Sequence, residues 1–414
     1  MNIGAPWPSL NEAEARVLGL QKKLHQWALA DGQRRFDDVF NLVCDPAFLV
    51  VAWQRVRGNK GARTAGVDGI APRSIGEDAD AFLMGLRAQL KALQFRALPV
   101  RQTSIPKANG KFRRLGIPVT ADRVVQASLK LVMEPIFEAD FKPCSYGFRP
   151  NRRAQDAIAE IHFLSKPSLK YDWVFEGDIK ACFDEIDHTA LMDRVRHRIT
   201  DRRILALIKA FLKAGLLTEA GQPRKTITGT PQGGILSPLL ANIALSVLDE
   251  HFTDKWDALG PYWMRSKHRR AGHPVMRLIR YCEKRATYTY PSKQSLLSVM
   301  EKVRSLTRRS KHHSLTELIQ ALNRVLRGWC NYFRHGVSSR TFSYLDHFTF
   351  WRIVGWLRKR HLGLNWGTLH RRYLPGWEVR ESSSELFRPA RVEIVRYRYR
   401  GSRIPTPWAT EALA

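Results

Sequence analysis

The sequence predicts an α+β protein in which helices and short β-structure occupy different stretches of the chain. Apolar residues recur at three-and-four spacing near both ends, which is typical of helices that bury one face. Shorter stretches between them show the alternation and turn residues of β-strands. The chain has 414 residues, of which 44% are hydrophobic and 10% aromatic. It is therefore long enough for two or three domains and too apolar to be disordered throughout.

The first third of the chain is predicted to be largely helical, with one hairpin. Residues 12–57 and Asp78–Leu93 have helical periodicity, and a Gly-rich loop lies between them at Asn59–Gly69. Arg101–Pro118 is predicted to form a β-hairpin, because two β-like runs flank Asn109-Gly110, a pair that favours tight turns. The basic side chains of this hairpin are compatible with nucleic-acid contact and also with a solvated edge strand.

The remaining elements follow from the same patterns. Further helices are predicted at Asp122–Phe137, Ile204–Leu217, Leu239–Leu248, Ser314–Phe333 and Phe342–His361. Trp173–Phe183 has the composition of a β-strand with an acidic end. Loops are predicted at Ser145–Arg153, Gly229–Pro238 and the first half of Trp263–Arg280. The chain after Asn365 is rich in Arg and Pro and is predicted to be partly irregular.

The strongest functional signal in the composition is positive charge. The chain carries 68 Lys and Arg against 38 Asp and Glu, and residues 262–414 alone contain 31 against 9. Nucleic acid is the usual polyanion that neutralises such a charge. A generally basic protein and a membrane-surface binder are the alternatives, but the second would need a basic amphipathic anchor that the sequence lacks. The C-terminal region also holds seven of the twelve Trp, which are expected to be mostly core residues.

Cysteine content and apolar runs exclude other classes. The five Cys include no C-x-x-C pair, so a zinc ribbon or redox motif is not supported, and free thiols in a reducing compartment are expected. Membrane spans need about 18 consecutive apolar residues, and no run of that length occurs. The N-terminus lacks the pattern of a secretory signal, so a cytoplasmic location is expected.

The segment Asp178–Asp187, DIKACFDEID, is the clearest candidate for metal chemistry. It places carboxylates at the end of the predicted strand and just beyond it. Mg²⁺ prefers oxygen ligands and commonly binds through one or two carboxylates together with substrate phosphates. Taken alone, the segment is better explained as an exposed acidic turn, and only the other sequence blocks favour a metal site.

Five sequence blocks together resemble the reverse transcriptase/maturase proteins encoded by group II introns. In chain order they are IPKANGKFRRLGIP, SYGFRPNRR, EGDIKACFDEIDH, GTPQGGILSPLLANI and LNRVLRGWCNYF. The resemblance implies right-hand polymerase-like fingers and an incomplete palm, followed by a helical thumb/maturase domain. The implied boundaries are an N-terminal helical region (1–58), fingers-like region (59–153), partial palm (154–281), connection (282–299), thumb/maturase-like domain (300–364) and basic tail (365–414).

The resemblance also implies roles for individual residues. Asp178 is similar to the first metal-binding aspartate of the palm and would hold Mg²⁺ as a catalytic residue. Phe183 matches the aromatic residue that senses the ribose 2′-OH, and Gln232 lies near the incoming nucleotide. The fingers residues that meet the triphosphate are Lys107, Lys111 and Arg113. Basic side chains of the C-terminal helices are expected to contact RNA: Arg324, Arg327, Arg334, Arg358, Lys359 and Arg360.

One departure from the family pattern bears on activity. The family carries a Tyr-Ala-Asp-Asp box, and MRLIRY, ending at Tyr281, is its usual lead-in; here Cys282, Glu283 and Lys284 follow instead. The only Asp-Asp pair of the sequence is Asp37-Asp38, far upstream. We interpret this as an internal deletion. A two-metal mechanism clamps two ions roughly 3.5–4 Å apart, so templated DNA synthesis is expected to be absent or negligible.

Three functions therefore compete. The first is a binding protein that holds group II intron RNA and assists splicing and mobility, with target DNA as a further candidate partner. The second is an active RNA-directed DNA polymerase of a retroelement, and the third is a degenerate copy without function. No membrane or protein partner is implied.

Overall fold

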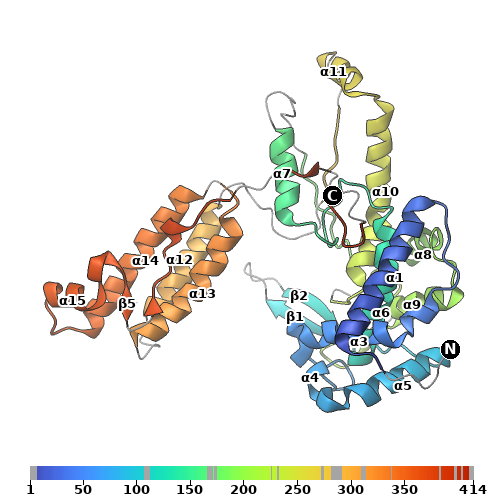
Figure 1. Cartoon of the computed structure of the whole chain (residues 1–414), viewed down its shortest axis with the longest axis horizontal. Coiled ribbons are helices and arrows are strands. Elements are labelled where there is room, and N and C mark those ends of the chain that lie inside the picture. The colour runs from blue at the N-terminus through green and yellow to red at the C-terminus, as the bar shows by residue number, and fades with distance from the viewer. Residues whose placement is uncertain are drawn as a thin grey trace. The chain divides into compact units, whose positions relative to one another are not determined.

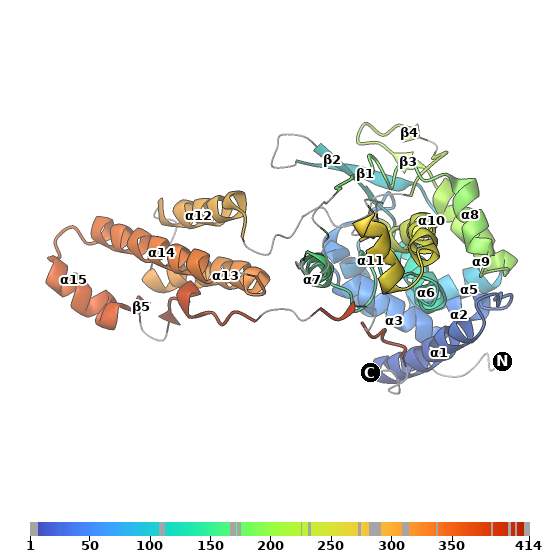
Figure 2. The ribbon, with the colours of Figure 1, turned by 90° about the horizontal axis from the view of Figure 1, so that it is seen from above.

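The computed structural model describes residues 7–106, 112–165, 171, 175–224, 226–230, 233–271, 275–280, 291–308, 314–336, 338–381, 384–395, 399–401 and 404–409, without the side chains of Glu77 and Arg113. The chain forms two compact units. Unit 1 comprises Met1–Arg152, Trp173–Cys282 and Gly401–Ala414, and unit 2 comprises Arg153–Asp172 and Glu283–Arg400. The elements of both are labelled in Figure 1, and Figure 2 gives a second view.

Three helices form the centre of unit 1: α1 (Leu10–Ala30), α3 (Pro46–Gly58) and α6 (Thr120–Glu138). Ser9 and Glu12 form a capping box at the start of α1, and Asp45 caps α3, whose first residue is proline. Both arrangements satisfy N–H groups that a helix start leaves unpaired. Helix α6 is buried along almost its whole length, with Leu129 and Ile136 fully enclosed. Shorter elements complete this part: α2 (Phe40–Val43), η1 (Lys60–Arg63), α4 (Pro72–Ile75), η2 (Gly76–Asp78) and α5 (Ala79–Lys91).

A small mixed sheet lies in unit 1. Strands β1 (Val100–Pro106) and β2 (Phe112–Ile117) pair antiparallel, from Arg101 opposite Ile117 to Pro106 opposite Phe112. The predicted hairpin is thus confirmed, although its Asn-Gly turn lies outside the described residues. Strand β3 (Leu216–Leu217) pairs parallel to β1 and antiparallel to β4 (Pro223–Arg224), giving the order β2-β1-β3-β4.

The rest of unit 1 is helical and contains two departures from prediction. Its helices are α8 (His188–Arg196), α9 (Arg202–Lys213), α10 (Ser237–Ala258) and α11 (Tyr262–Arg270). The loop prediction for the first half of Trp263–Arg280 was wrong, because these residues form α11. Its Arg, Lys and Met residues favour helix, but α11 buries no residue, so it lacks the apolar periodicity from which a helix is recognised.

The strand predicted at Trp173–Phe183 was also wrong over its described part. Phe175–Ile179 is irregular, residues 180–184 form turns, and the Phe175 side chain is 93% exposed. A strand needs a neighbour to pair with its N–H and C=O groups. Among the residues that the structure describes, no strand pairs with this segment. The β-like composition therefore had no sheet to join.

Unit 2 is built around a layer of long helices, α12 (Lys293–Arg308), α13 (Leu315–Phe333) and α14 (Ser339–Arg360). Leu318, Leu322 and Leu326 of α13, at the predicted three-and-four spacing, are fully buried among them. Helix α12 was not predicted. The remaining elements are α7 (Ala154–Leu164), α15 (Trp366–Tyr373), η3 (Pro375–Trp377), the β5–β6 pair (Arg380–Glu381 with Ser384–Glu385) and η4 (Pro389–Arg391).

The predicted α+β class is confirmed, with helices predominating and β-structure confined to two small sheets. In the described parts of the chain, no helix has the combined length and apolar character to cross a membrane.

Candidate nucleic-acid interface

Unit 1 brings the loop Gly229–Pro238 against the Asp178–Asp187 segment. The Gly229 N–H donates to the carbonyl of Ile186 at 2.8 Å, and the Thr230 N–H donates to that of Phe183 at 2.7 Å. Gly229 has φ +82°, and a Cβ there would lie 2.5 Å from the Asp184 carbonyl oxygen. Only glycine accommodates both the left-handed backbone and this close approach. The loop is therefore fixed to the acidic segment by backbone contacts.

The same loop also contacts the β1–β2 hairpin. Gly233 has φ +121°, and a Cβ would lie 2.4 Å from the carbonyl oxygen of Gly116 on β2. The Ile235 N–H donates to the side-chain oxygen of the buried Gln126 on α6 at 3.0 Å. Gln232 itself lies outside the described residues, but the loop that carries it is held between the hairpin and the acidic segment.

The SYGFRPNRR block meets this assembly through an aromatic contact and a buried arginine. Phe148 and Phe183 pack edge to face with ring centroids 6.2 Å apart. Arg149 is buried and pairs with Glu138 of α6 at 2.7 Å, and it also donates to the carbonyls of Lys142 and Ser145. Because the ion pair is accompanied by further hydrogen bonds, the buried charge is well satisfied.

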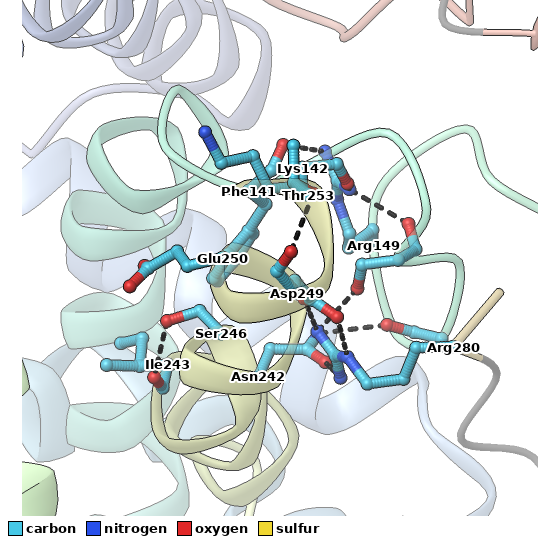
Figure 3. Close-up of polar contacts among 12 residues, drawn as sticks. Phe141, Lys142, Arg149, Asn242, Ile243, Ser246, Asp249, Glu250, Thr253 and Arg280 are labelled. Carbon is cyan, nitrogen blue, oxygen red and sulfur yellow. Dashed lines mark hydrogen bonds and ion pairs between the residues drawn. The ribbon is translucent and has the colours of Figure 1, made fainter. Parts of the chain in front are cut away.

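A second buried network, which the sequence had not suggested, fixes the end of the MRLIRY lead-in (Figure 3). Arg280 makes a two-pronged pair with Asp249 of α10, with Nη2 and Nε at 2.6 and 2.7 Å. It also donates to Asn242 at 3.0 Å and to the Ser145 hydroxyl at 2.6 Å, and Asn242 in turn donates to the Gly147 carbonyl at 2.8 Å. The one sequence feature that could have pointed to this network is Asp249, an acidic residue that directly follows the largely apolar first part of helix α10. Four of the five sequence blocks thus converge in unit 1.

The predicted polymerase residues are only partly described. Asp178 is exposed on irregular backbone, whereas Phe183 is half-buried against the core of unit 1. Arg113 lies on β2 opposite Ile105. Lys107 and Lys111, like Gln232, lie outside the described residues. The nucleotide-binding roles of all these residues remain predictions.

The carboxylates near Asp178 do not assemble a donor set for Mg²⁺. Asp187 is the N-cap of α8, where its side chain accepts from the Ala190 N–H at 2.7 Å. Within the described parts of the chain, no three or more His, Cys, Asp or Glu side chains are grouped so that they could hold a metal ion. Asp178 is one exposed carboxylate, whereas a two-metal site needs ligands that bridge and clamp both ions. The residues that the structure describes therefore do not fit the pair of ions.

The predicted RNA-binding residues occupy two helices of unit 2. Arg324 and Arg327 are exposed on α13, and the half-buried Arg334 follows its last turn. Arg358, Lys359 and Arg360 are exposed on the last turn of α14. Cations at this end of a helix are favoured by its dipole, so their position has a structural explanation beside the expected RNA contact. Their RNA-binding role also remains a prediction.

Four positively charged side chains of unit 1 surround a hollow of about 700 Å³ at the end of α3. It is lined by Arg57, Lys60, Arg63 and Arg73, and its other lining residues are uncharged. All four cations are exposed, and none forms a hydrogen bond or ion pair within the described residues. We call this hollow the basic pocket. Its charge is complementary to phosphate.

Buried groups of α6 hold the loop beside the basic pocket in place. The Arg123 guanidinium donates to the carbonyls of Gly61 at 3.1 Å and Thr64 at 2.7 Å. Its neighbour Asp122 accepts from the Leu98 N–H at 3.1 Å. Burial raises the pKa of Asp122 to about 7, and its second oxygen has no hydrogen-bond partner in the described structure. The carboxyl group is thus protonated more readily than usual.

Comparison with protein families gives two overlapping matches. Residues 105–310 match the reverse transcriptase (RNA-dependent DNA polymerase) family, and residues 296–374 match the group II intron, maturase-specific domain. Together the two matches extend over well more than half of the chain.

Individual relatives agree with these matches. Protein YkfC of Escherichia coli (strain K12) is 38% identical over 239 residues, which are 57% of this chain and 62% of YkfC. Group II intron-encoded protein LtrA of Lactococcus lactis subsp. cremoris is 36% identical over 260 residues, 60% of this chain and 42% of LtrA. The chain therefore matches less than two thirds of the length of either relative. A solved chain from a partial Cas6-RT-Cas1–Cas2 complex aligns with 65% of this chain at a TM-score of 0.35 and 20% identity, a similarity on which no conclusion rests.

Proposed function

The chain belongs to the group II intron reverse transcriptase/maturase family, and we propose that it acts as an RNA-binding maturase that has lost polymerase activity. In this role it binds a group II intron RNA and assists its splicing and mobility. Target DNA is a further proposed partner, and we place the protein with its nucleic acid in the cytoplasm of a prokaryotic cell.

The observation that carries the binding role is that both units present exposed, positively charged side chains. The maturase-specific match covers most of α12 and all of α13, α14 and α15, which enclose a continuous apolar core. Exposed cations remain on the outside of this core, and the basic pocket of unit 1 adds four more. Phosphate contacts of this kind supply most of the affinity of a protein for RNA. None of these surfaces depends on the polymerase carboxylates.

Loss of polymerase activity is supported by the chemistry of the Asp178 region. Reverse transcriptases generally depend on Mg²⁺, and the aspartates of the Tyr-Ala-Asp-Asp box help to bind it. The sequence contains no such box. The position where its lead-in ends, Tyr281 to Glu283, lies outside the described residues. Asp178 is exposed and the nearby Asp187 caps a helix, and neither belongs to a group of three or more metal-ligating side chains among the described residues. Phosphoryl transfer depends on positioned charge, and the described residues supply little of it.

The binding role is tested with the full chain and an intron RNA. Affinity is measured at several salt concentrations, with unrelated RNA of equal length as competitor, and splicing is measured at low Mg²⁺ with and without protein. A maturase is expected to retain preference for the intron RNA as salt rises and to accelerate splicing. Binding that is equally strong to both RNAs and disappears with salt would instead identify a degenerate copy.

The loss of activity is tested by primer extension on an RNA template with Mg²⁺. Wild type and Asp178→Ala are expected to give the same background incorporation. Incorporation by wild type well above that of the variant would contradict the proposal and favour an active RNA-directed DNA polymerase.

A further inference from the structure

A group of half-exposed aromatic side chains lies on α14, α15 and η3 of unit 2. Trp351, Trp366 and Trp377 are 49%, 43% and 54% exposed. They are linked by Phe350 and His370: ring centroids are 5.5 Å apart for Phe350 and Trp351, 6.2 Å for Phe350 and Trp377, and 4.7 Å for His370 and Trp377. We call these five residues the aromatic surface. It is continuous, because Trp366 and Trp377 are also only 6.5 Å apart.

This surface is not explained by the core of unit 2. Other tryptophans do serve that core: Trp356 is 6% exposed and Trp329 is half-buried against it. Three neighbouring tryptophans that each leave about half their area in solvent form an apolar patch of the kind that marks a binding site. Together with Trp263, which is 66% exposed, they make four exposed Trp among the seven of the C-terminal region, so the expectation that most of these Trp are core residues is wrong.

The backbone that presents Trp377 is strained. Trp377 has φ 64° and follows Gly376, which has φ 62°. A left-handed conformation is unfavourable for a bulky side chain and is kept where the surrounding structure or a function requires it. The His370 Nε2 atom beside it is buried without a hydrogen-bond partner in the described structure. The turn therefore holds the indole in place at a cost in stability.

The charges around the aromatic surface favour an anionic ligand. Arg358 and Lys359 lie in the last turn of α14, about two helical turns beyond Trp351, and Arg371 follows His370 on α15. All three are exposed and form no hydrogen bond or ion pair among the described residues. The ends of these two helices meet where His361 stacks on Tyr373 at 5.1 Å. Glu378, next to Trp377, is already paired with Arg380 and Arg391. The surface thus combines flat rings with unneutralised positive charge.

We propose that the aromatic surface binds unpaired nucleotides of RNA, whose bases stack on the tryptophan rings while Arg358, Lys359 and Arg371 neutralise phosphates. Single-stranded nucleic acid is recognised in this way because every base has a face that can stack. Paired bases do not offer their faces, so a duplex cannot use the rings. This inference rests on the proposed function and adds that this surface binds the unpaired nucleotides of the RNA.

The test compares full-length wild type with Trp366→Ala and Trp377→Ala. Each protein is titrated with a single-stranded RNA oligonucleotide and with a blunt RNA duplex of equal length by fluorescence anisotropy. Each substitution is expected to weaken single-strand binding about tenfold and to leave duplex binding and the salt dependence unchanged, because no charge is removed. Trp377→Phe should restore most of the affinity, since it keeps an aromatic ring.

Trp27→Ala is the matched control. Trp27 is 44% exposed, like Trp366, but lies on α1 in unit 1, and its replacement should not change the single-strand affinity. Equal losses for single strand and duplex, or no loss for either, would overturn the proposal and point to a different partner, such as a protein. Wild type that binds neither RNA would instead refute the proposed function itself. Thermal unfolding of each variant verifies that unit 2 remains folded.

Discussion

The two units of this chain are stabilised differently. Unit 1 contains charged side chains that are almost completely buried and that connect distant segments, such as Arg149 with Glu138 and Arg280 with Asp249. The ion pairs of unit 2 are more exposed: the side chains of Arg388 and Asp346 are 28% and 9% exposed. Its three long helices are held mainly by leucines and other apolar residues.

Because the two units are stabilised differently, they should be sensitive to different substitutions. A buried ion pair adds little net stability over an apolar pair, but losing one partner leaves an uncompensated charge. An apolar helix interface tolerates most surface changes. Unit 1 should therefore depend on single polar residues and unit 2 should not. Substitutions in each unit, compared by their effect on unfolding and RNA binding, test that contrast.

Removing Arg280 should have the largest effect. Arg280→Met leaves Asp249 charged and buried, and we expect unit 1 to lose about 3–5 kcal/mol of unfolding free energy. Urea unfolding followed by circular dichroism measures this loss. Arg270→Met, which removes an exposed cation of α11 in the same unit, is the control and should change little. The double variant Arg280→Met/Asp249→Leu should recover much of the loss, and failure to recover would argue against the buried-charge explanation.

The second effect is a pH dependence that originates at Asp122. Burial raises its folded pKa to about 7, above the ordinary value near 3.9 of an unfolded chain. The folded state therefore binds the proton more tightly, so this contribution to stability is complete below about pH 4 and is lost as pH rises to 7. The loss should amount to a few kcal/mol.

Asp122→Asn removes this titration. Urea midpoints of wild type and variant, measured at pH 4.5 and pH 8, should show that wild type loses more stability than the variant on going to pH 8. Parallel changes in the two proteins would mean that the Asp122 pKa is not raised.

The third effect concerns RNA affinity through the basic pocket. Replacing Arg57, Lys60 and Arg63 by Gln should weaken intron RNA binding and reduce the slope of log affinity against log salt by up to about 2, since each phosphate contact contributes roughly 0.7–0.9. The control removes the same charge elsewhere in unit 1 by Lys22→Gln, Lys23→Gln and Arg35→Gln, which are exposed positions. If both triple variants change the slope equally, the pocket is no more than part of a diffuse positive surface.

The smallest effect is expected in unit 2. Arg304→Ala breaks a pair with the exposed Glu301, and exposed pairs contribute about 1 kcal/mol or less. Urea unfolding should show a shift much smaller than that of Arg280→Met. A loss of similar size would remove the contrast between the two units.

Much of unit 2 and the motif content of unit 1 could be predicted. The spacing of Leu318, Leu322 and Leu326 gave α13, and Asn109-Gly110 between two β-like runs gave the hairpin. Helix α11 could not be recognised, because it buries no residue and so has no apolar periodicity. The residues of α12 were divided between the expected connection and the start of the thumb, and no separate helix was predicted there. In the candidate site, the sequence blocks could be recognised, but the contacts between them could not. Gly229 and Gly233 approach the backbone carbonyls of Asp184 and Gly116, and a pattern of side chains does not reveal such backbone contacts.

The positive charge, the family resemblance and the lack of a Tyr-Ala-Asp-Asp box are properties of composition and residue order, so they can be read from the sequence. The same holds for most helices, because their hydrogen bonds join residues four apart. The folded structure was needed to show that Arg280 pairs with Asp249, 31 residues away, and that Arg198 donates to Ala28, 170 residues away. It likewise decided that Phe175–Ile179 is no strand and that four cations surround one hollow. Those outcomes depend on which partners the folded chain supplies, and local sequence carries no record of a distant partner.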